Sequence, residues 1–178
     1  MINRAIFLDR DGTLNLSYPQ DLKTAPPKSL DEIVILDGVT EGLDILRKLK
    51  FKLVVVTNQP DYIRGSTSLK NLIEINSQIC AILNIKFAYI CLHDYEDKCP
   101  CRKPNNGFFL QASTDLEINL AESYLIGDRL SDVQAGIASG CTSFLIEGDS
   151  NKIANSYISV PSMLEAVKLI SERELLNG

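Results

Sequence analysis

The sequence predicts an α/β protein, a Rossmann-like three-layer α/β/α arrangement with helices on both faces of a parallel sheet. Short apolar runs alternate along the chain with segments whose apolar residues recur at helical spacing. The run KLVVVT at residues 52–57 is apolar without a polar alternation, which is typical of a parallel strand covered on both faces. Together these two observations predict the fold class.

The elements are expected in regular alternation. The strands are expected at 5–8, 52–57, 87–92, 123–128 and 142–147. The helices are expected at 38–49, 68–83, 107–118, 131–139 and 161–176. Pro161 suits the first turn of the last helix. Residues 15–37 are polar and contain prolines, which predicts an irregular loop or a small hairpin.

Length and composition narrow the classes of function. A chain of 178 residues suits a single domain, 1–178, and the small size favours a monomer. The formal net charge of -5 argues against partners that need a basic face, namely nucleic acid or a membrane surface. No apolar run approaches the ~20 residues of a membrane span, and the N-terminus lacks a signal-peptide pattern. The expected compartment is therefore the cytoplasm.

Four residues of types that commonly bind metal ions lie within the short segment 91–101. Cys91, His93, Cys99 and Cys101 offer one imidazole and three thiolates, a set that Zn²⁺ binds tetrahedrally in structural sites. The alternative is that some of these cysteines are buried small apolar residues. The two other cysteines are expected to pack in the interior: Cys80 and Cys141.

Polar side chains follow the expected strands, at the edge where ligands bind in open α/β sheets. These residues are Asp9 and Asp11 after the first strand, Thr57 and Asn58 after the second, Arg102 and Lys103 beyond the third, and Asp128 and Arg129 after the fourth. Each motif alone occurs in ordinary turns and helix caps. Their joint occurrence at strand ends indicates a site where a hard cation meets an oxyanion.

Phosphoryl transfer is the chemistry that these groups allow. Asp9 can act as a nucleophile that forms an aspartyl-phosphate. Asp11 can protonate the leaving alcohol and then activate water. Asp9 and Asp128, with an oxygen near Asp11, can hold Mg²⁺, while Lys103 and Thr57 stabilise the transferring oxygens.

The motifs DRDGTLN, VVTNQ, CRKP and GDRLSD resemble those of the haloacid-dehalogenase phosphatase superfamily over nearly the whole chain. The closer resemblance is to its histidinol-phosphatase-like branch, which holds heptose bisphosphate and histidinol-phosphate phosphatases. The resemblance implies the roles given above, with the main-chain carbonyl of Asp11 as a further Mg²⁺ ligand and Arg10 pointing elsewhere. It also implies a zinc loop at 91–101 and, because no segment is long enough for a cap domain, a capless open site.

The substrate is expected to be a small phosphorylated sugar. The stretch NQPDYIRG resembles the heptose-bisphosphate group, which implies hydrolysis of the 7-phosphate of a D-glycero-D-manno-heptose 1,7-bisphosphate in lipopolysaccharide precursor synthesis. The residues expected to contact substrate are Asn58, Arg64, Arg102 and Arg129, whose arginines suit a second phosphate. Alternatively, Arg64 caps a loop or pairs with a carboxylate. Pro60-Asp61 departs from the family's Ser-Gly and puts the shape of this loop in question.

Two other functions compete with this one. The near alternative is a histidinol-phosphate phosphatase, which shares the catalytic groups. A receiver-like signalling module is the distant alternative, because it also has an acidic Mg²⁺ pocket, a Thr and a Lys. Such a module carries its phospho-accepting Asp after the third strand, where this chain has Cys91 and His93.

Overall fold

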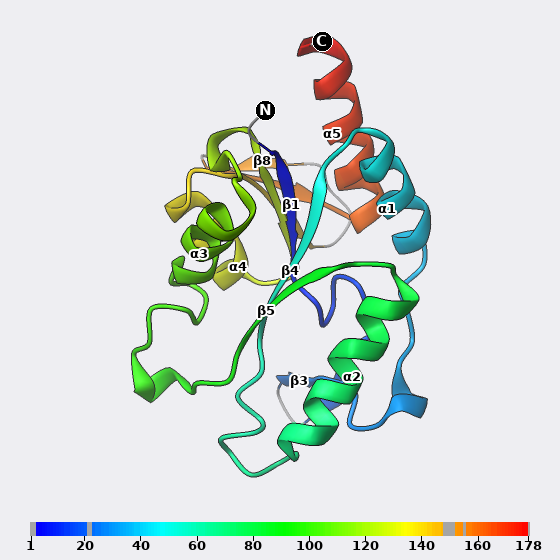
Figure 1. The fold of residues 1–178 in the computed structure, drawn as a ribbon. Helices are drawn as coiled ribbons and strands as arrows, with labels where there is room; N and C mark the ends of the chain where they lie inside the picture. The colour runs from blue at the N-terminus through cyan, green and yellow to red at the C-terminus, as the bar shows by residue number, and fades with distance from the viewer. Residues whose placement is uncertain (1–2, 21–22, 148–151, 155, 178) are drawn as a thin grey trace.

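The computed structural model describes residues 3–20, 23–147, 152–154 and 156–177. Within these ranges the main sheet has seven strands in the order β5-β4-β1-β6-β7-β9-β8 (Figure 1). Six run parallel, and β8 pairs antiparallel with β9 at one edge. The strands are β1 Ala5–Leu8, β4 Lys52–Asn58, β5 Phe87–Cys91, β6 Tyr124–Gly127, β7 Thr142–Ile146, β8 Lys152–Ala154 and β9 Tyr157–Val160.

Helices cover both faces of this sheet, as the sequence predicts (Figure 1). They are α1 Val39–Lys48, α2 Leu69–Ile82, α3 Gly107–Leu116, α4 Leu130–Ala138 and α5 Met163–Asn177. Successive side chains of β1 point to opposite faces. Ile6 and Leu8 join the core under α1, α2 and α5, whereas Ala5 and Phe7 join the core under α3 and α4. The three-layer α/β/α prediction is confirmed.

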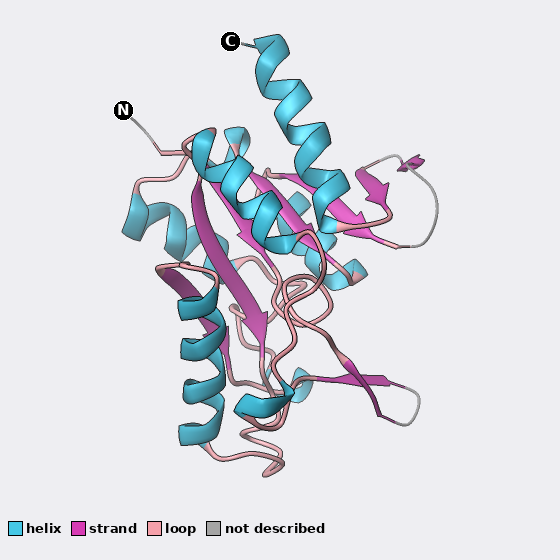
Figure 2. Ribbon diagram, turned by 90° about the vertical axis from the view of Figure 1, so that its right-hand side faces the viewer, coloured by secondary structure: helices cyan, strands magenta, loops and turns pink. Residues whose placement is uncertain are grey.

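The segment between β1 and α1 forms a small hairpin and no cap domain. Its strands are β2 Tyr18–Gln20 and β3 Lys23–Ala25, followed by the short 3-10 helix Leu30–Glu32. Figure 2 shows this hairpin below the sheet, on the side to which the arrowhead of the longest strand points. The hairpin therefore lies at the carboxyl ends of the parallel strands, where a ligand site is expected.

The structure corrects three details of the sequence analysis. The strands β8 and β9 were not predicted, and β8 makes the sheet mixed at this edge. Both are short, and neither contains a continuous apolar run like AIFL of β1, which marked that strand in the sequence. The last helix begins at Met163, because the Ser162 hydroxyl accepts the Glu165 N–H at 3.2 Å as an N-cap, so Pro161 precedes the helix.

No helix in the described part of the chain combines the length and the apolar character needed to cross a membrane.

Candidate active site

A buried ion-pair cluster occupies the carboxyl end of β1. The Asp9 N–H donates to the Ile126 carbonyl at 3.0 Å, so the chain is still held against β6 where the Asp9 side chain begins. The Lys103 Nζ lies 2.5 Å from Asp9 Oδ1 and 2.7 Å from Asp132 Oδ1. It also donates to the Val56 carbonyl at 2.6 Å. The lysine is thus held between two carboxylates and a strand end.

Burial and like charges shift the acid–base equilibria of this cluster. Burial, together with the nearby carboxylates of Asp132 and Asp128, raises the pKa of Asp9 to about 7, although the Lys103 ammonium opposes this. Burial, and then Asp132, raise the pKa of Asp128 to about 6. Burial by itself would lower the pKa of Lys103, but Asp132 and Asp9 raise it to about 12. The lysine stays charged, but its positive charge does not offset the burial of Asp9 and Asp128 and their repulsion by the neighbouring carboxylates.

The three acidic side chains are arranged as a cation site would require. Carboxylate oxygens of Asp9, Asp128 and Asp132 lie within 4.8 Å of one another. Asp128 Oδ1 is buried and has no hydrogen-bond partner among the described residues. An unpartnered buried carboxylate oxygen is costly, and oxygen ligands of this kind are those that Mg²⁺ prefers. The residues present therefore fit a hard divalent cation.

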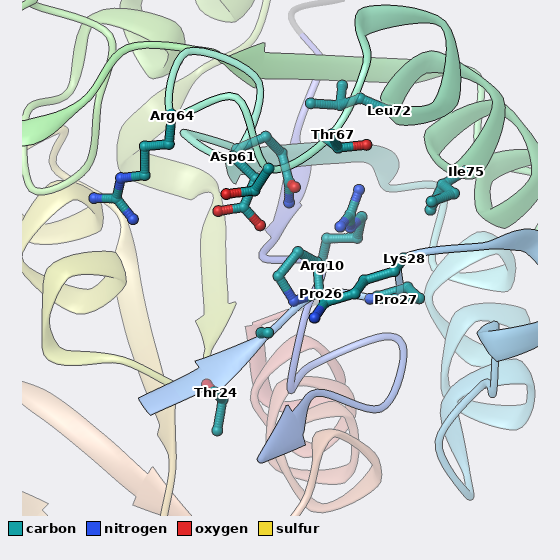
Figure 3. A pocket seen from close by; sticks show the side chains of 13 residues that line it. Arg10, Thr24, Pro26, Pro27, Lys28, Asp61, Arg64, Thr67, Leu72 and Ile75 are labelled. Carbon is teal, nitrogen blue, oxygen red and sulfur yellow. The ribbon is translucent and has the colours of Figure 1, made fainter. Parts of the chain in front are cut away.

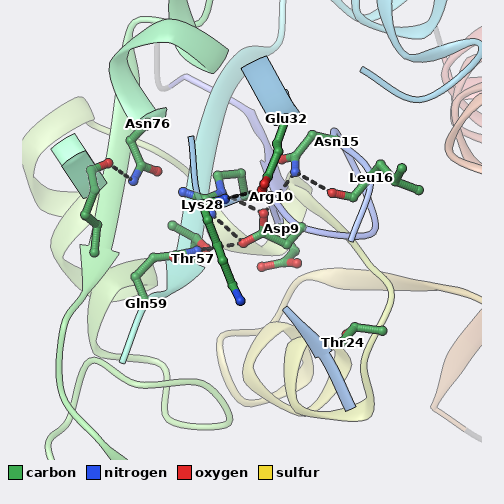
Figure 4. A network of polar contacts seen from close by, with 12 residues as sticks. Asp9, Arg10, Asn15, Leu16, Thr24, Lys28, Glu32, Thr57, Gln59 and Asn76 are labelled. Carbon is green, nitrogen blue, oxygen red and sulfur yellow. Dashed lines mark hydrogen bonds and ion pairs between the residues drawn. The ribbon is translucent and has the colours of Figure 1, made fainter. Parts of the chain in front are cut away.

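Asp11 is held in place by side-chain donors of Arg10, Asn15 and Gln59, all three of which are labelled in Figure 4. Arg10 donates from Nε to Asp11 Oδ1 at 3.0 Å and from Nη2 to Oδ2 at 2.7 Å. Asn15 Nδ2 and Gln59 Nε2 donate to the same two oxygens, at 3.0 Å and 2.7 Å. The expectation that Arg10 points elsewhere is wrong. The tight turn after β1 folds the arginine back on its neighbour, and its side chain is buried.

The end of β4 brings Thr57 and Asn58 to the same edge. The Thr57 hydroxyl is buried and accepts a hydrogen bond from Gln59 Nε2 at 2.9 Å. The Asn58 amide makes two bonds with the Lys103 backbone: Nδ2 donates to the carbonyl at 3.0 Å, and Oδ1 accepts the N–H at 3.1 Å. Asn58 thus positions the lysine segment in this structure, so the polar groups of its side chain already have partners.

The arginines expected to contact substrate each have a partner in the surrounding loops. Arg64 makes a bidentate pair with Asp94, with both N–O distances at 2.6 Å. Arg102 donates to the His93 carbonyl at 3.0 Å. Arg129 donates to the Thr24 hydroxyl of the β2–β3 hairpin at 2.9 Å. The alternative given for Arg64, pairing with a carboxylate, is what the structure contains.

One cavity of about 740 Å³ collects the residues predicted at these strand ends, apart from Asp128, which lies beside Asp9 but does not line the cavity. Its lining includes Asp9, Asp11, Thr57, Asn58, Arg64, Arg102, Lys103 and Arg129. Asp61 and Tyr95 line it as well. The strand ends therefore meet in a single cavity, as the sequence predicts.

A second hollow of about 470 Å³ adjoins this cavity, and the two share Thr24, Pro26, Gln59, Asp61 and Arg64. Figure 3 shows Lys28 and Arg10 on one side of it and Asp61 on another. It gives a substrate that fills the first cavity room to extend toward α2.

The Cys/His cluster has the dimensions of a tetrahedral metal site. Cys101 Sγ lies 3.4 Å from each of the other ligand atoms, which belong to Cys91, His93 and Cys99. Cys91 Sγ lies 3.6 Å from His93 Nδ1 and 3.7 Å from Cys99 Sγ. Ligands at ~2.3 Å around a tetrahedral zinc would be roughly 3.7 Å apart. Burial raises the pKa of the Cys91 and Cys101 thiols, so the thiolate forms need a cation to stabilise them.

The two cysteines outside the cluster behave as expected. Both are free, with Cys141 buried and Cys80 half-buried.

Two residues of the site were given no role by the sequence analysis. Asp132 is buried, pairs with Lys103 and accepts the Arg129 N–H at 2.9 Å, as a residue in the first turn of α4. Gln59 is also buried and bridges Asp11 and Thr57. Both lie inside motifs that the sequence analysis quoted, GDRLSD and VVTNQ, and only the distances assign them partners.

A parallel α/β sheet with an Asp–Lys–Asp cluster at its carboxyl edge is the arrangement of a haloacid-dehalogenase-like hydrolase. A family model described as HAD-hydrolase-like matches residues 100–158.

Similar proteins show to which part of this family the chain belongs. The D-glycero-beta-D-manno-heptose-1,7-bisphosphate 7-phosphatase of Haemophilus influenzae is 31% identical over 189 residues, covering 94% of this chain and 100% of that protein. The protein of the same name from Escherichia coli K12 is 36% identical over 146 residues, covering 75% of this chain and 73% of that protein. The chain therefore belongs to the haloacid-dehalogenase-like family that contains these heptose bisphosphate phosphatases.

A solved structure supports the fold. It is the D,D-heptose 1,7-bisphosphate phosphatase of B. bronchiseptica complexed with magnesium and phosphate, which superposes with a TM-score of 0.82 at 24% identity. The superposition covers 96% of this chain and 99% of that chain.

Proposed function

We propose that this protein is a Mg²⁺-dependent phosphatase that removes the 7-phosphate from D-glycero-β-D-manno-heptose 1,7-bisphosphate. The observation that carries the proposal is the Asp9 carboxylate, held by Lys103 beside Asp128 at the end of β1. The names of relatives at 31% and 36% identity support the substrate and its anomer.

Asp9 is the proposed nucleophile. Its oxygen attacks the phosphorus, the bond from phosphorus to the sugar oxygen breaks, and Asp11 gives a proton to that oxygen. Water then attacks the aspartyl-phosphate and loses a proton to Asp11, which releases inorganic phosphate and restores Asp9. Lys103 and the Thr57 hydroxyl stabilise negative charge on the transferring oxygens.

Mg²⁺ is the proposed cofactor of this cavity. The side chains of Asp9 and Asp128 and the main-chain carbonyl of Asp11 would hold it. When bound, it supplies positive charge that offsets repulsion between the carboxylates and the phosphate. The unpartnered Asp128 Oδ1 supports this assignment.

Zn²⁺ is the proposed ligand of Cys91, His93, Cys99 and Cys101, in a structural role because all four positions are filled by protein. It would hold the loop that carries Arg102 and Lys103 into the cavity.

The distal part of the substrate is proposed to contact Asn58, Arg64, Arg102 and Arg129, which line the cavity. Arg64 already pairs with Asp94, so a second phosphate would compete with this carboxylate for the guanidinium. Asp61 adds a further negative charge nearby, and the pKa of Arg64 is raised by its bond to Asp94 and by Asp61. Only a strongly anionic group, such as a phosphate, would displace Asp94.

Phosphate release tests the proposal directly. The purified protein is given Mg²⁺ and, in parallel, the α and β heptose 1,7-bisphosphates and histidinol phosphate. We expect the highest kcat/KM with the β anomer. Preference for histidinol phosphate would contradict the substrate and leave the catalytic roles intact, whereas no release from any of them would contradict the function itself.

Asp9→Asn tests the nucleophile, with Asp44→Asn as the matched control because Asp44 pairs with Arg47 on the exposed face of α1, away from the cavity. We expect Asp9→Asn to abolish turnover and Asp44→Asn to keep it within about twofold. Turnover by Asp9→Asn near the wild-type rate would contradict the role of Asp9.

Three expectations from the sequence stay predictions: one domain spanning 1–178, a monomer, and a cytoplasmic location with no nucleic-acid or membrane partner. Sedimentation of the purified protein would test the monomer.

A further inference from the structure

The amide nitrogen of Gln59 joins two catalytic side chains. Gln59 is 3% exposed and follows the end of β4. Its Nε2 donates to Asp11 Oδ2 at 2.7 Å and to Thr57 Oγ1 at 2.9 Å. Figure 4 shows the Gln59 and Thr57 side chains next to each other. A primary amide has two N–H hydrogens. Both are therefore used, one for the proposed acid–base group and one for the proposed phosphate-binding hydroxyl.

The Gln59 side chain extends from a fixed point of the backbone. The Gln59 N–H donates to the Cys91 carbonyl at 2.7 Å, which extends the pairing of β4 with β5 by one residue. The side chain reaches from there to the neighbouring strand end that carries Asp11. Its geometry is thus set by the sheet.

Arg10 and Asn15 complete the hold on Asp11. With Gln59 they direct four N–H groups at the two oxygens of one carboxylate. In the described part of the chain, Arg10 pairs with no other carboxylate. Because the Arg10 guanidinium is buried and its ion pair is with Asp11, it holds the Asp11 carboxylate in one orientation.

The Thr57 hydroxyl gains a direction from the same contact. Because its oxygen accepts the Gln59 N–H, its own hydrogen stays available. Among the residues that the structure describes, none accepts that hydrogen. Thr57 lines the cavity, so a phosphate oxygen there is the acceptor that this hydroxyl lacks.

We propose that Gln59 is a positioning residue that orients Asp11 and Thr57 together, with Arg10 and Asn15 completing the hold on Asp11. This inference rests on the proposed phosphatase function. In this role Gln59 fixes Asp11 and Thr57 relative to each other. Asp11 can then protonate the leaving oxygen while Thr57 binds an oxygen of the transferring phosphoryl group.

Gln59→Met tests this because methionine keeps the length of the side chain and removes both N–H donors. Two substrates are compared: the heptose bisphosphate, whose leaving alkoxide needs a proton, and p-nitrophenyl phosphate, whose leaving phenolate does not. On the bisphosphate we expect kcat to fall by about 10- to 100-fold with KM changed less than about threefold. On p-nitrophenyl phosphate we expect a burst of nitrophenolate, because formation of the aspartyl-phosphate continues while its hydrolysis, which needs Asp11, is slowed.

Two further variants separate positioning from general damage. Arg10→Lys keeps the charge and loses the bidentate geometry, so it should show the same dependence on the leaving group. In a cycle with Thr57→Val, the losses caused by Gln59→Met should be non-additive.

The matched control is Asn76→Leu. Asn76 is an equally buried amide, 3% exposed, which donates to the Leu72 carbonyl within α2 and, among the residues described, to no other acceptor. We expect Asn76→Leu to change the stability of the protein but to give no burst of nitrophenolate.

Equal losses of Gln59→Met on both substrates without a burst, or wild-type kcat on both, would overturn the inference while the function stands. A wild-type protein that releases phosphate from neither substrate would instead overturn the proposed function, and the inference with it.

Discussion

At the scale of single residues, the turn after β1 depends on a contact between Gly12 and Asp128. Gly12 has φ +89°, and a Cβ added there would lie 2.1 Å from Asp128 Oδ2. The glycine is needed twice, for its left-handed conformation and for the space that Asp128 occupies. Two motifs 116 positions apart in the sequence therefore constrain each other.

Gly12→Ala should accordingly damage both stability and activity. The left-handed conformation alone costs about 1 kcal/mol for an L residue, and Asp128 must also move. We expect a lower free energy of unfolding in urea and at least about a tenfold loss of kcat/KM for phosphate release.

Gly140→Ala is the matched control, since Gly140 has φ +85° and open space around its Cβ position. It should lose about 1 kcal/mol of stability and keep its activity. Full activity in Gly12→Ala would show that Asp128 does not need its present position.

The raised pKa values of Asp9 and Asp128 predict a pH dependence of stability without divalent metal. Both carboxyls start from an ordinary value of 3.8 and reach about 7 and about 6 in the folded protein. The folded state therefore binds more protons than the unfolded state across this window, so stability falls as pH rises from about 4 to 7.

Urea unfolding with EDTA should show this fall, and Asp128→Asn should show a shallower one because it removes one charge and relieves Asp9. Adding Mg²⁺ at pH 7 should raise the free energy of unfolding of the wild-type protein again. If the wild type and Asp128→Asn lose stability equally as pH rises, the electrostatic argument is contradicted.

At the scale of elements, the loop between β5 and α3 is short of apolar support. Within it, Tyr95 is 74% exposed and the neighbouring residues 96–98 are exposed as well. The four sulfur and nitrogen ligands lie where β5 ends and where the loop returns to Lys103. A metal at this point would replace the missing hydrophobic core of the loop.

Cys99→Ser should therefore release zinc, raise hydrogen exchange across residues 92–102 and raise KM, because Arg102 and Lys103 lie on the freed loop. The measurements are metal content, exchange by mass spectrometry and phosphate-release kinetics.

Cys80→Ala is the control, since Cys80 is half-buried in α2 and outside the cluster. It should keep one zinc per chain. Stoichiometric zinc in Cys99→Ser, or unchanged exchange in its loop, would contradict the role of the cluster.

At the scale of the whole molecule, hydrogen bonds connect the last helix, α5, to the amino ends of β1 and β6. Glu174 of α5 accepts from Arg4 Nη1, just before β1, and from the Tyr124 hydroxyl of β6 at 3.0 Å. Arg4 in turn lies over the Phe51 ring at 4.6 Å. These contacts lie at the amino ends of the strands, opposite the active site.

Glu174→Ala should lower the free energy of unfolding by about 1–3 kcal/mol, because it leaves a partly buried arginine and tyrosine without an acceptor. Phosphate release should be unchanged.

Glu165→Ala on the same helix removes a surface pair with Lys168 and should cost less than about 0.5 kcal/mol. A large loss of kcat in Glu174→Ala would show that the two ends of the strands are coupled.

Sequence pattern alone determined the alternation of strands and helices and the edge of the sheet where the site lies. It also predicted two groups of candidate metal ligands, Asp9 with Asp128 and the Cys/His cluster, and the structure brings the side chains of each group together. These features follow from local periodicity and from the rule that carboxyl ends of parallel strands meet.

Only the tertiary structure decided which polar groups are already partnered. It turned Arg10 onto Asp11, paired Arg64 with Asp94, and gave Gln59 its bridge to Thr57. Hydrogen-bond partners are a matter of a few tenths of an ångström between segments distant in sequence, and no periodicity records such distances. The chain's own order thus determined where the chemistry lies, and the packing of its loops decided which side chains hold the reacting groups in place.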